Sequence, residues 1–287
     1  MQSLGEDYPV SARCAVLGLA RSSYYHRAKP REHQGLREAI AAVAGRHTAY
    51  GSRRVAVELN RASRSPAVGR HLVRRLMREM DLDIKLKKRQ GSGTDSQHGY
   101  RRYRNLVKGV KPQRPDQVWV ADITYVRVGA RFAYLALIMD VFTRSIRGWH
   151  LSWSSGQDLT LAALRKALEH HPAPEIHHSD QGGQYAAKDY IKLLRDRGTQ
   201  ISMAAKGKPS ENGYAERLIR TIKEEEVDRS DYQSMAEARE QLGHFIDVVY
   251  QQERIHSAKG YQTPAEFEAA WLQRNSLKFL EILCPII

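Results

Sequence analysis

The spacing of apolar residues changes near Gln117 and divides the chain into two parts. Before this residue, apolar positions recur at helical intervals in residues 9–29, 36–60 and 65–82. After it, the runs QVWVADITYVRV and FAYLALIMDVFT are rich in β-branched and aromatic residues, which is typical of strands. Because only GAR separates the two runs, we expect an antiparallel hairpin.

The second part continues with alternating strand and helix patterns. SIRGWHLSW is predicted to be a third strand, DLTLAALRKALEHH a helix, and EIHHSD a strand that ends in the loop DQGGQY. A helix closed by Gly198, the strand TQISMA and the helix YAERLIRTIKEEEV follow. This order of three strands, helix, strand, helix, strand and helix predicts an α/β fold with a mixed sheet flanked by helices.

The first part is predicted to be helical. Residues 9–29 indicate two short helices that break near Gly18, like the end of a helix-turn-helix unit whose first helix is missing or supplied elsewhere. In SPAVGRHLVRRLMREMDL, Ser65 is the expected N-cap and Pro66 the first helical residue. One face of this helix is apolar, and the opposite face carries Arg70, Arg74, Arg75 and Arg78.

The positive charge of the chain is concentrated in its first part. The formal net charge is +14, and residues 1–115 hold 25 Lys and Arg against 9 Asp and Glu. Such a concentration attracts the phosphates of DNA or RNA. The arginine face and the basic segment 85–115, with Lys87, Lys88 and Arg89, are therefore candidate DNA contacts, although a solvated basic surface explains the same residues.

Composition also narrows the class of protein. The 287 residues contain no run of eighteen apolar positions and no basic-then-apolar beginning typical of a signal peptide. The two cysteines are far apart and fit no metal-binding pattern, so free thiols in a reducing compartment are expected. We therefore expect a cytoplasmic protein without a membrane partner.

Three acidic residues stand out by their positions. Asp122 lies inside the apolar first strand, Asp180 at the end of the fourth, and Glu216 in the first turns of the last helix of this part. If the two strands are neighbours and the helix crosses them, the three carboxylates meet at one rim. Oxygen ligands of this kind suit Mg²⁺ or Mn²⁺, and two such ions can support displacement at phosphorus.

The surroundings of the three carboxylates allow a second interpretation. Arg220 and Lys223 share the helix face of Glu216 and could hold a DNA phosphate, whereas Glu224, Glu225 and Glu226 are expected to be solvated. Spacing alone equally allows an Asp122 satisfied by backbone donors, an Asp180 that starts a turn, and a Glu216 on a surface helix.

Three motifs raise the first interpretation above the second. VWVADITYV, HHSDQGGQY and GKPSENGYAERLIRTIKEE resemble the three signatures of the DDE integrase core, with 35 residues between Asp180 and Glu216. The chain resembles most the large bacterial insertion-sequence group whose transposase is made from two overlapping reading frames, of which this looks like the second. The helical segment before the core and QERIHSAKGYQTPAEF near the end are also similar to that group.

The resemblance implies an RNase H-like core behind all-α helix-turn-helix segments, and a DNA transposase that cleaves element ends and transfers strands. It implies that Asp122, Asp180 and Glu216 hold two Mg²⁺ ions, for which Mn²⁺ is expected to substitute. Element ends and target DNA are the expected substrates, bound by a homodimer or higher oligomer, with the upstream-frame product as a further partner. The loop before Glu216 departs from the usual GNPYDNA but keeps Asn212, a candidate DNA contact.

The resulting division of the chain is a partial helix-turn-helix (1–30), a helical DNA-binding domain (31–90), a basic linker (91–115), the catalytic core (116–230) and a helical tail (231–287). Several polar residues are weighed against a structural role. His177 and His178 are expected to be strand residues and Asp140 a turn residue, while Arg254 and His256 suit either structure or DNA contact equally. A nuclease that cuts without joining and a non-catalytic DNA-binding regulator remain the rival functions.

Overall fold

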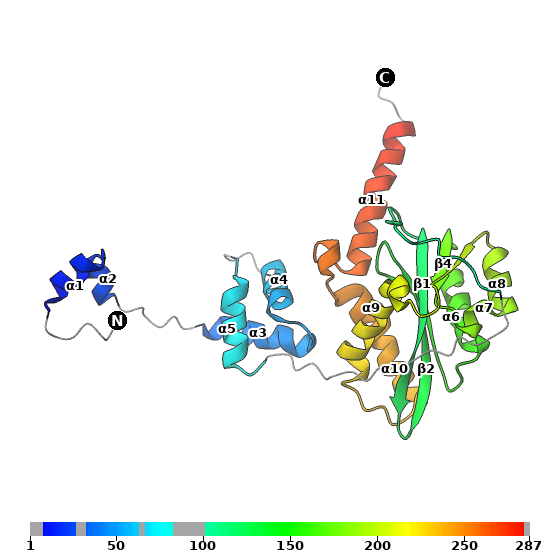
Figure 1. The fold of residues 1–287 in the computed structure, drawn as a ribbon, viewed down its shortest axis with the longest axis horizontal. Helices are drawn as coiled ribbons and strands as arrows, with labels where there is room; N and C mark the ends of the chain where they lie inside the picture. The colour runs from blue at the N-terminus through cyan, green and yellow to red at the C-terminus, as the bar shows by residue number, and fades with distance from the viewer. Residues whose placement is uncertain (1–7, 27–32, 63–66, 83–100, 284–287) are drawn as a thin grey trace.

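The computed structural model describes residues 8–26, 33–62, 67–82 and 101–283, in which a helical N-terminal part precedes an α/β core (Figure 1). Within these ranges, no helix is long and apolar enough to cross a bilayer.

Five strands form one mixed sheet, which confirms the predicted fold class. They are β1 (Val118–Val128), β2 (Arg131–Asp140), β3 (Ile146–Ser152), β4 (Ile176–Ser179) and β5 (Gln200–Met203). The order is β3-β2-β1-β4-β5; β1 to β3 are antiparallel, and β4 and β5 run parallel to β1. The predicted hairpin is confirmed, and the second strand already begins at Arg131, opposite Val128.

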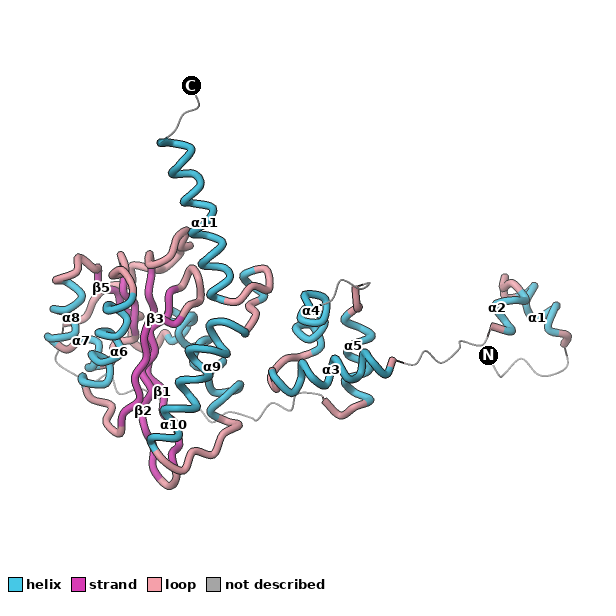
Figure 2. The backbone as a smooth tube through the Cα atoms, turned by 180° about the vertical axis from the view of Figure 1, so that it is seen from behind, coloured by secondary structure: helices cyan, strands magenta, loops and turns pink. Residues whose placement is uncertain are grey.

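Helices cover both faces of the sheet (Figures 1 and 2). Those on one face are α6 (Gln157–His170), α7 (Gly183–Ala186) and α8 (Lys188–Arg195), and those on the other are α9 (Gly213–Ile222) and α10 (Met235–His244). Val118 and Val120 pack on the α9 side, while Trp119 and Ala121 pack on the α6 side. Burial of both faces explains the nearly unbroken apolar sequence of β1.

One glycine sets the approach of α6 to the sheet. A Cβ built on Gly148 in β3 would collide with the carbonyl oxygen of Ala163 and come within 2.9 Å of the Ala167 side chain. Only a residue without a side chain lets the helix lie this close to the strand.

Two helices on the α9 side continue beyond their α-helical parts. Helix α9 runs into the π-helical segment η2 (Lys223–Val227), and α10 runs into η3 (Phe245–Glu253). The helix predicted over YAERLIRTIKEEEV therefore exists, with its last turns widened. π-Helical turns are rare and occur frequently near functional sites.

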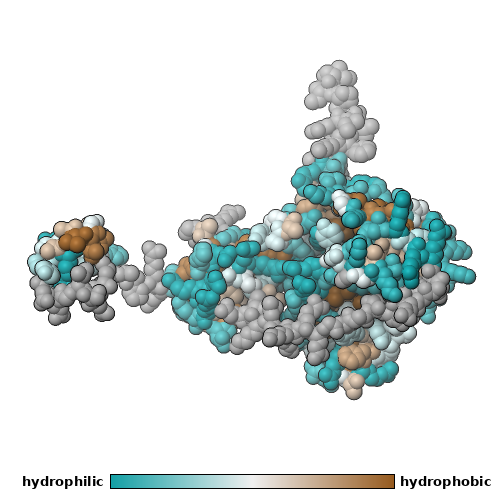
Figure 3. Space-filling view, viewed as in Figure 1, coloured by the Kyte–Doolittle hydropathy of each residue, from teal (hydrophilic) through white to brown (hydrophobic). Residues whose placement is uncertain are grey.

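The first two helices are α1 (Val10–Val16) and α2 (Arg21–Tyr25). The predicted break near Gly18 is confirmed, since this residue has φ of 61°. Apolar side chains gather on the visible surface of this pair (Figure 3), where the exposed ones are Val16, Leu17, Leu19, Tyr24 and Tyr25.

Three further helices, α3 (Gln34–Arg46), α4 (Ser52–Ala62) and α5 (Arg70–Glu79), share a small apolar core. Residues 36–60 are thus divided between two helices. The predicted start of α5 is wrong, because the helix begins at Arg70 with Gly69 in extended conformation as its N-cap. Ser65 and Pro66 lie outside the described residues.

The tail packs against both parts of the molecule. Leu242, Phe245 and Ile246 belong to the core on the α9 side, whereas Ile255 belongs to the apolar core of α3–α5. The short η4 (Ser257–Lys259) and α11 (Pro264–Leu283) follow. The end of the predicted linker also lies on the core, where the Leu106 N–H donates to Ser202 Oγ at 2.8 Å.

Candidate active site

The pairing of β1 with β4 brings two of the predicted carboxylates together. Val120 lies opposite His178 in this parallel pair, and β4 ends one residue before Asp180. Asp122 and Asp180 are each two residues further along, so they emerge at the same edge of the sheet. This is the carboxyl end of β4, where α/β folds place ligand groups.

Burial and charge both act on Asp122. Removal from water is the main cause that raises the pKa of this carboxyl to about 7, and the charge of Asp180 adds to it, as does that of Glu216 more weakly. The Ile123 N–H donates to Asp122 Oδ1 at 2.8 Å and opposes the shift. The charges of Asp180 and Glu216 thus both act on Asp122, which is consistent with the first interpretation of the sequence.

Hydrogen bonds from the loop before α9 hold Glu216 over this edge. Asn212 Nδ2 donates to the carbonyl oxygen of Ala121, the neighbour of Asp122, at 3.2 Å. His178 Nε2 lies 3.1 Å from the carbonyl oxygen of Glu211. The loop is therefore tied to β1 and β4, the strands that carry the two aspartates.

The same bonds change the picture of Asn212 and His178. Asn212 is buried, with 4% of its surface exposed, and its side chain braces the start of α9 against β1. His177 and His178 are buried strand residues, as expected, and His177 Nε2 lies 3.0 Å from the Tyr190 hydroxyl. The bracing role of His178 could not be predicted from the sequence, because its partner is a backbone carbonyl that is distant in the chain.

A second residue that spacing did not single out is Tyr185. Its hydroxyl is buried without a hydrogen-bond partner. Burial is the main cause that raises the pKa of this hydroxyl, and Tyr190 and the charges of Asp122 and Asp180 add to the shift. A buried polar atom without a partner costs stability unless something else satisfies it. Tyr185 belongs to the motif DQGGQY, which was predicted to be a loop; that prediction is wrong for its second half, where Gly183–Ala186 forms α7.

These observations test whether the site suits a metal ion. No three His, Cys, Asp or Glu side chains of the described residues are already gathered closely enough to ligate one. The donor set nevertheless fits Mg²⁺, because Asp180 and Glu216 repel the carboxylate of the buried Asp122, and a divalent cation relieves that repulsion. The unsatisfied Tyr185 hydroxyl beside them fits a site that also holds bound water.

Cationic residues of α9 and η2 lie next to Glu216. Arg220 is exposed one turn further along, and Lys223 Nζ sits 3.8 Å from the centroid of the Tyr125 ring in β1. On α5, Arg70, Arg74, Arg75 and Arg78 are all exposed, as a DNA-binding face requires. Lys87, Lys88 and Arg89 lie outside the described residues.

The expectation that Glu224, Glu225 and Glu226 are solvated is wrong for two of them. Glu225 forms ion pairs with Arg254 and Arg54, and Glu226 accepts hydrogen bonds from Ser230 and from the Tyr232 hydroxyl. Helical spacing alone does not show that the tail and α4 reach this side of the helix.

Two open assignments are decided by the same contacts. Arg254 is structural, since it is buried and paired with Glu225. Asp140 is a turn residue, as expected, because its Oδ2 accepts from both the N–H and the hydroxyl of Thr143 at 2.7 Å.

Known protein families match the two parts of the chain. The HTH-like domain family matches residues 31–90. Two families, both described as integrase core domain, match the overlapping residues 112–209 and 197–264. Among solved structures, the HTLV-2 integrase catalytic core domain in complex with magnesium (trimeric form) is 14% identical, with a TM-score of 0.44 over 55% of this chain and 99% of that one. The simian T-cell lymphotropic virus intasome with the PP2A regulatory subunit B56 gamma is 13% identical, with a TM-score of 0.48 over 80% and 74%.

Relatives of known name are similar along nearly their whole length. The insertion element IS600 uncharacterized 31 kDa protein of Shigella sonnei is 35% identical over 91% of this chain and 98% of its own. The transposase for insertion sequence element IS629 of the same organism is 32% identical over 94% and 95%. Transposase InsF for insertion sequence IS3A of Escherichia coli K12 is 30% identical over 91% and 94%. Together with the matched domains, these relatives show that the chain belongs to the DDE insertion-sequence transposases of the IS3 family.

Proposed function

We propose that this transposase cuts DNA at the ends of its element and joins the new 3′-hydroxyl to target DNA at one site. The observation that carries the proposal is the electrostatic coupling of Asp122 to Asp180 and Glu216 at the end of β4. In the first step water attacks the phosphodiester at the element end and a 3′-hydroxyl leaves. In the second, that hydroxyl attacks a target phosphodiester and a target 3′-hydroxyl leaves.

The three carboxylates suit these steps because they supply oxygen ligands and no nucleophile of their own. Asp122, Asp180 and Glu216 would hold two Mg²⁺ ions, with Mn²⁺ as a substitute, and such ions supply Lewis acidity at phosphorus and at the attacking oxygen. Asn212 keeps α9, and with it Glu216, in register with Asp122. Arg220 and Lys223, on the side of Glu216, bind the phosphate that is attacked.

DNA binding is assigned to the basic N-terminal part. The exposed Arg70, Arg74, Arg75 and Arg78 on α5 contact phosphates, and the basic segment with Lys87, Lys88 and Arg89 follows the backbone further. Because one site acts on one end while two ends must be joined, we infer a homodimer or higher oligomer on DNA. The upstream-frame product is a further partner, and the bacterial cytoplasm, at the nucleoid, is the proposed location.

A strand-transfer assay tests this function. A labelled duplex with the element end, a plasmid target and Mg²⁺ are incubated with the wild type, with Glu216→Gln, and with Glu224→Gln as the matched control on the same helix. Joined product is expected from the wild type and Glu224→Gln only. Cutting without joining would indicate a nuclease, and tight binding without any reaction, also after addition of the upstream-frame product, would indicate a regulator.

A further inference from the structure

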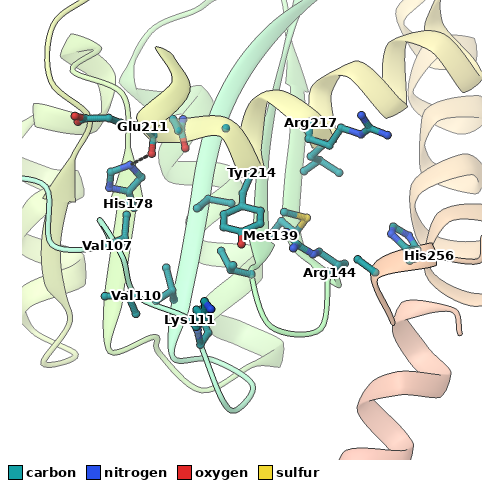
Figure 4. Close-up of a pocket in the computed structure, with 18 of the residues that line it drawn as sticks. Val107, Val110, Lys111, Met139, Arg144, His178, Glu211, Tyr214, Arg217 and His256 are labelled. Carbon is teal, nitrogen blue, oxygen red and sulfur yellow. Dashed lines mark hydrogen bonds between the residues drawn. The ribbon is translucent and has the colours of Figure 1, made fainter. Parts of the chain in front are cut away.

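A cavity of about 800 Å³ lies on the α9 side of the sheet and is separate in lining from the carboxylate site (Figure 4). Helix α9 contributes Tyr214, Arg217 and Thr221, whereas Glu216 and Arg220 on its other flank are not part of the lining. Helix α9 therefore carries a predicted catalytic carboxylate on one side, and an adjacent side of the same helix lines the cavity.

The floor of this cavity is apolar. It consists of Val118 and Val120 from β1, Met139 from β2, and Val141 just after β2. Ligand pockets of proteins have about this size, in the range of roughly 300–1,000 Å³, and combine apolar walls with a few polar groups. The volume and the floor suit a flat ring with a charged substituent.

The rim of the cavity is strongly cationic. Its basic residues are Arg54, Lys108, Lys111, Arg144, Arg217 and Arg254. Glu225 pairs with both Arg54 and Arg254 and offsets one of their two positive charges, and the single acidic residue of the lining, Glu211, is bound by Asn105 Nδ2 and the Ala205 N–H. The remaining excess of positive charge favours an anion.

His256, at the edge of the cavity, has a pKa that is shifted by several of the same cations. Burial, together with the nearby cations Arg254, Arg54, Arg144 and Lys259, lowers the pKa of this imidazole to about 2. Positive charge therefore outweighs negative charge around His256, even with Glu225 paired to Arg254 and Arg54.

Two residues form a surface for stacking. The Arg144 guanidinium lies 4.1 Å from the centroid of the Tyr214 ring, and 45% of the Tyr214 surface is exposed (Figure 4). Arg144 has φ of 70°, which a residue with a side chain rarely adopts, and the turn closed by Asp140 holds it there. Strained backbone conformations of this kind cluster at functional sites, where the side chain is held for a ligand.

We propose that this cavity binds a nucleotide that is not base-paired, with its base over the apolar floor and Tyr214 and its phosphate between Arg144 and Arg217. Aromatic rings and guanidinium planes are the groups on which proteins stack unpaired bases, and an acidic peptide would leave the floor unused. The inference rests on the proposed function, since the DNA substrate is one source of such a nucleotide. A free nucleotide is the other source of the same chemistry.

Competition binding with the full chain tests the proposal. The competitors are a blunt element-end duplex, the same duplex with a two-nucleotide 5′-phosphorylated overhang, and deoxyadenosine 5′-monophosphate alone. We expect the overhang to improve affinity by about tenfold, in line with stacking of one or two bases. Ala258→Trp, which places an indole in the exposed rim, should abolish this gain, Arg217→Ala should reduce it, and Arg197→Ala, an exposed arginine of another surface, should leave it unchanged.

The outcomes are distinct. A gain that also appears with the mononucleotide, and that Ala258→Trp removes, identifies a free nucleotide as an occupant of the same cavity. Equal affinities for blunt and overhanging duplexes without mononucleotide binding, or a gain that survives Ala258→Trp, overturn the proposal. The proposal is also overturned if an oligoglutamate peptide binds, if Ala258→Trp abolishes that binding, and if the overhang does not bind. Joining assays on the blunt duplex run in parallel, so failure of the joining reaction is read separately from failure of the cavity.

Discussion

Both Glu225 carboxylate oxygens accept a hydrogen bond from the Arg254 guanidinium, at 2.7 Å each, nine residues along the same continuous helix from Glu216. One of these oxygens also accepts from Arg54 of α4 at 3.3 Å. Glu225 therefore joins the helix of the catalytic site to the tail and to the HTH-like domain.

Loss of the Glu225 carboxylate should destabilise the protein strongly. Only 4% of the Arg254 side chain and 11% of the Glu225 side chain are exposed, so Glu225→Ala leaves a buried guanidinium without its partner. The expected cost is about 3–5 kcal/mol of unfolding free energy. Urea denaturation measures the loss of unfolding free energy, with Glu224→Ala as the control. Equal stability of the two variants would contradict a stabilising role of the Glu225–Arg254 pair.

The contact between the HTH-like domain and the tail is expected to depend on Tyr50. Its hydroxyl accepts from the Ile255 N–H at 2.8 Å, and both residues are buried. Tyr50→Phe leaves that N–H without an acceptor, at a cost of about 1–3 kcal/mol. The measurement is thermal unfolding, and proteolysis should cleave the variant faster near residue 255. A variant as stable and as resistant as the wild type would show that water replaces the hydroxyl.

Asn212→Ala should impair the reaction without unfolding the core. The variant loses the hydrogen bond that holds the start of α9 to Ala121. A shift of Glu216 by about 1 Å would cost about 10²-fold in joining rate, because catalysis depends on position. The rate is measured in the strand-transfer assay and the fold by circular dichroism. An unchanged joining rate would show that other contacts suffice to place α9.

The stability of the metal-free protein should fall as the pH rises from about 4 to about 7. The folded state raises the pKa of Asp122 from 3.8 to about 7, so across this interval it retains a proton that the unfolded chain has lost. The contribution of Asp122 to folding is therefore largest below pH 4 and is lost by pH 7. Urea titrations at several pH values should show the slope for the wild type and not for Asp122→Asn.

Mg²⁺ should compete with the proton for the Asp122 carboxylate. Binding needs the ionised carboxylate, so the affinity for Mg²⁺ is expected to decrease as the pH drops below about 7. Calorimetric titration with MgCl₂ at pH 6 and pH 8 checks this. Affinities that are equal at both values would mean that Asp122 does not contribute a ligand.

The exposed arginines of α5 should contribute to DNA binding through charge. Each phosphate contact that is removed reduces the slope of log affinity against log salt by about 0.9. Arg74→Ala is expected to show this reduction equally on specific and unrelated DNA, whereas Arg197→Ala is not. A loss confined to the element end would instead indicate that Arg74 reads bases.

Much of the core could be predicted from local patterns. Runs of β-branched and aromatic residues and helical spacings in residues 117–227 indicated the strands and the longer helices in their correct order, whereas α7 lies in an expected loop. The positions of Asp122 inside the first strand, Asp180 at the end of the fourth and Glu216 in the last helix predicted that they meet, and the charges of the other two act on Asp122. Such patterns survive because each element buries a continuous apolar face, and burial leaves a periodic trace in the sequence.

Contacts between distant segments left no such trace. The spacing of Glu225 is the same whether it faces water or Arg254, and Asn212 looks like any polar loop residue until its amide reaches the carbonyl of Ala121. The cavity beside α9 likewise combines α4, the segment before β1, the sheet and the tail. The sequence by itself determined most of the elements, because these follow from local patterns, and it singled out the three candidate carboxylates by their positions and by the resemblance of their motifs to the integrase core. Only the tertiary structure decided which polar groups pair, because a hydrogen bond depends on the distance between two atoms and not on their separation along the chain.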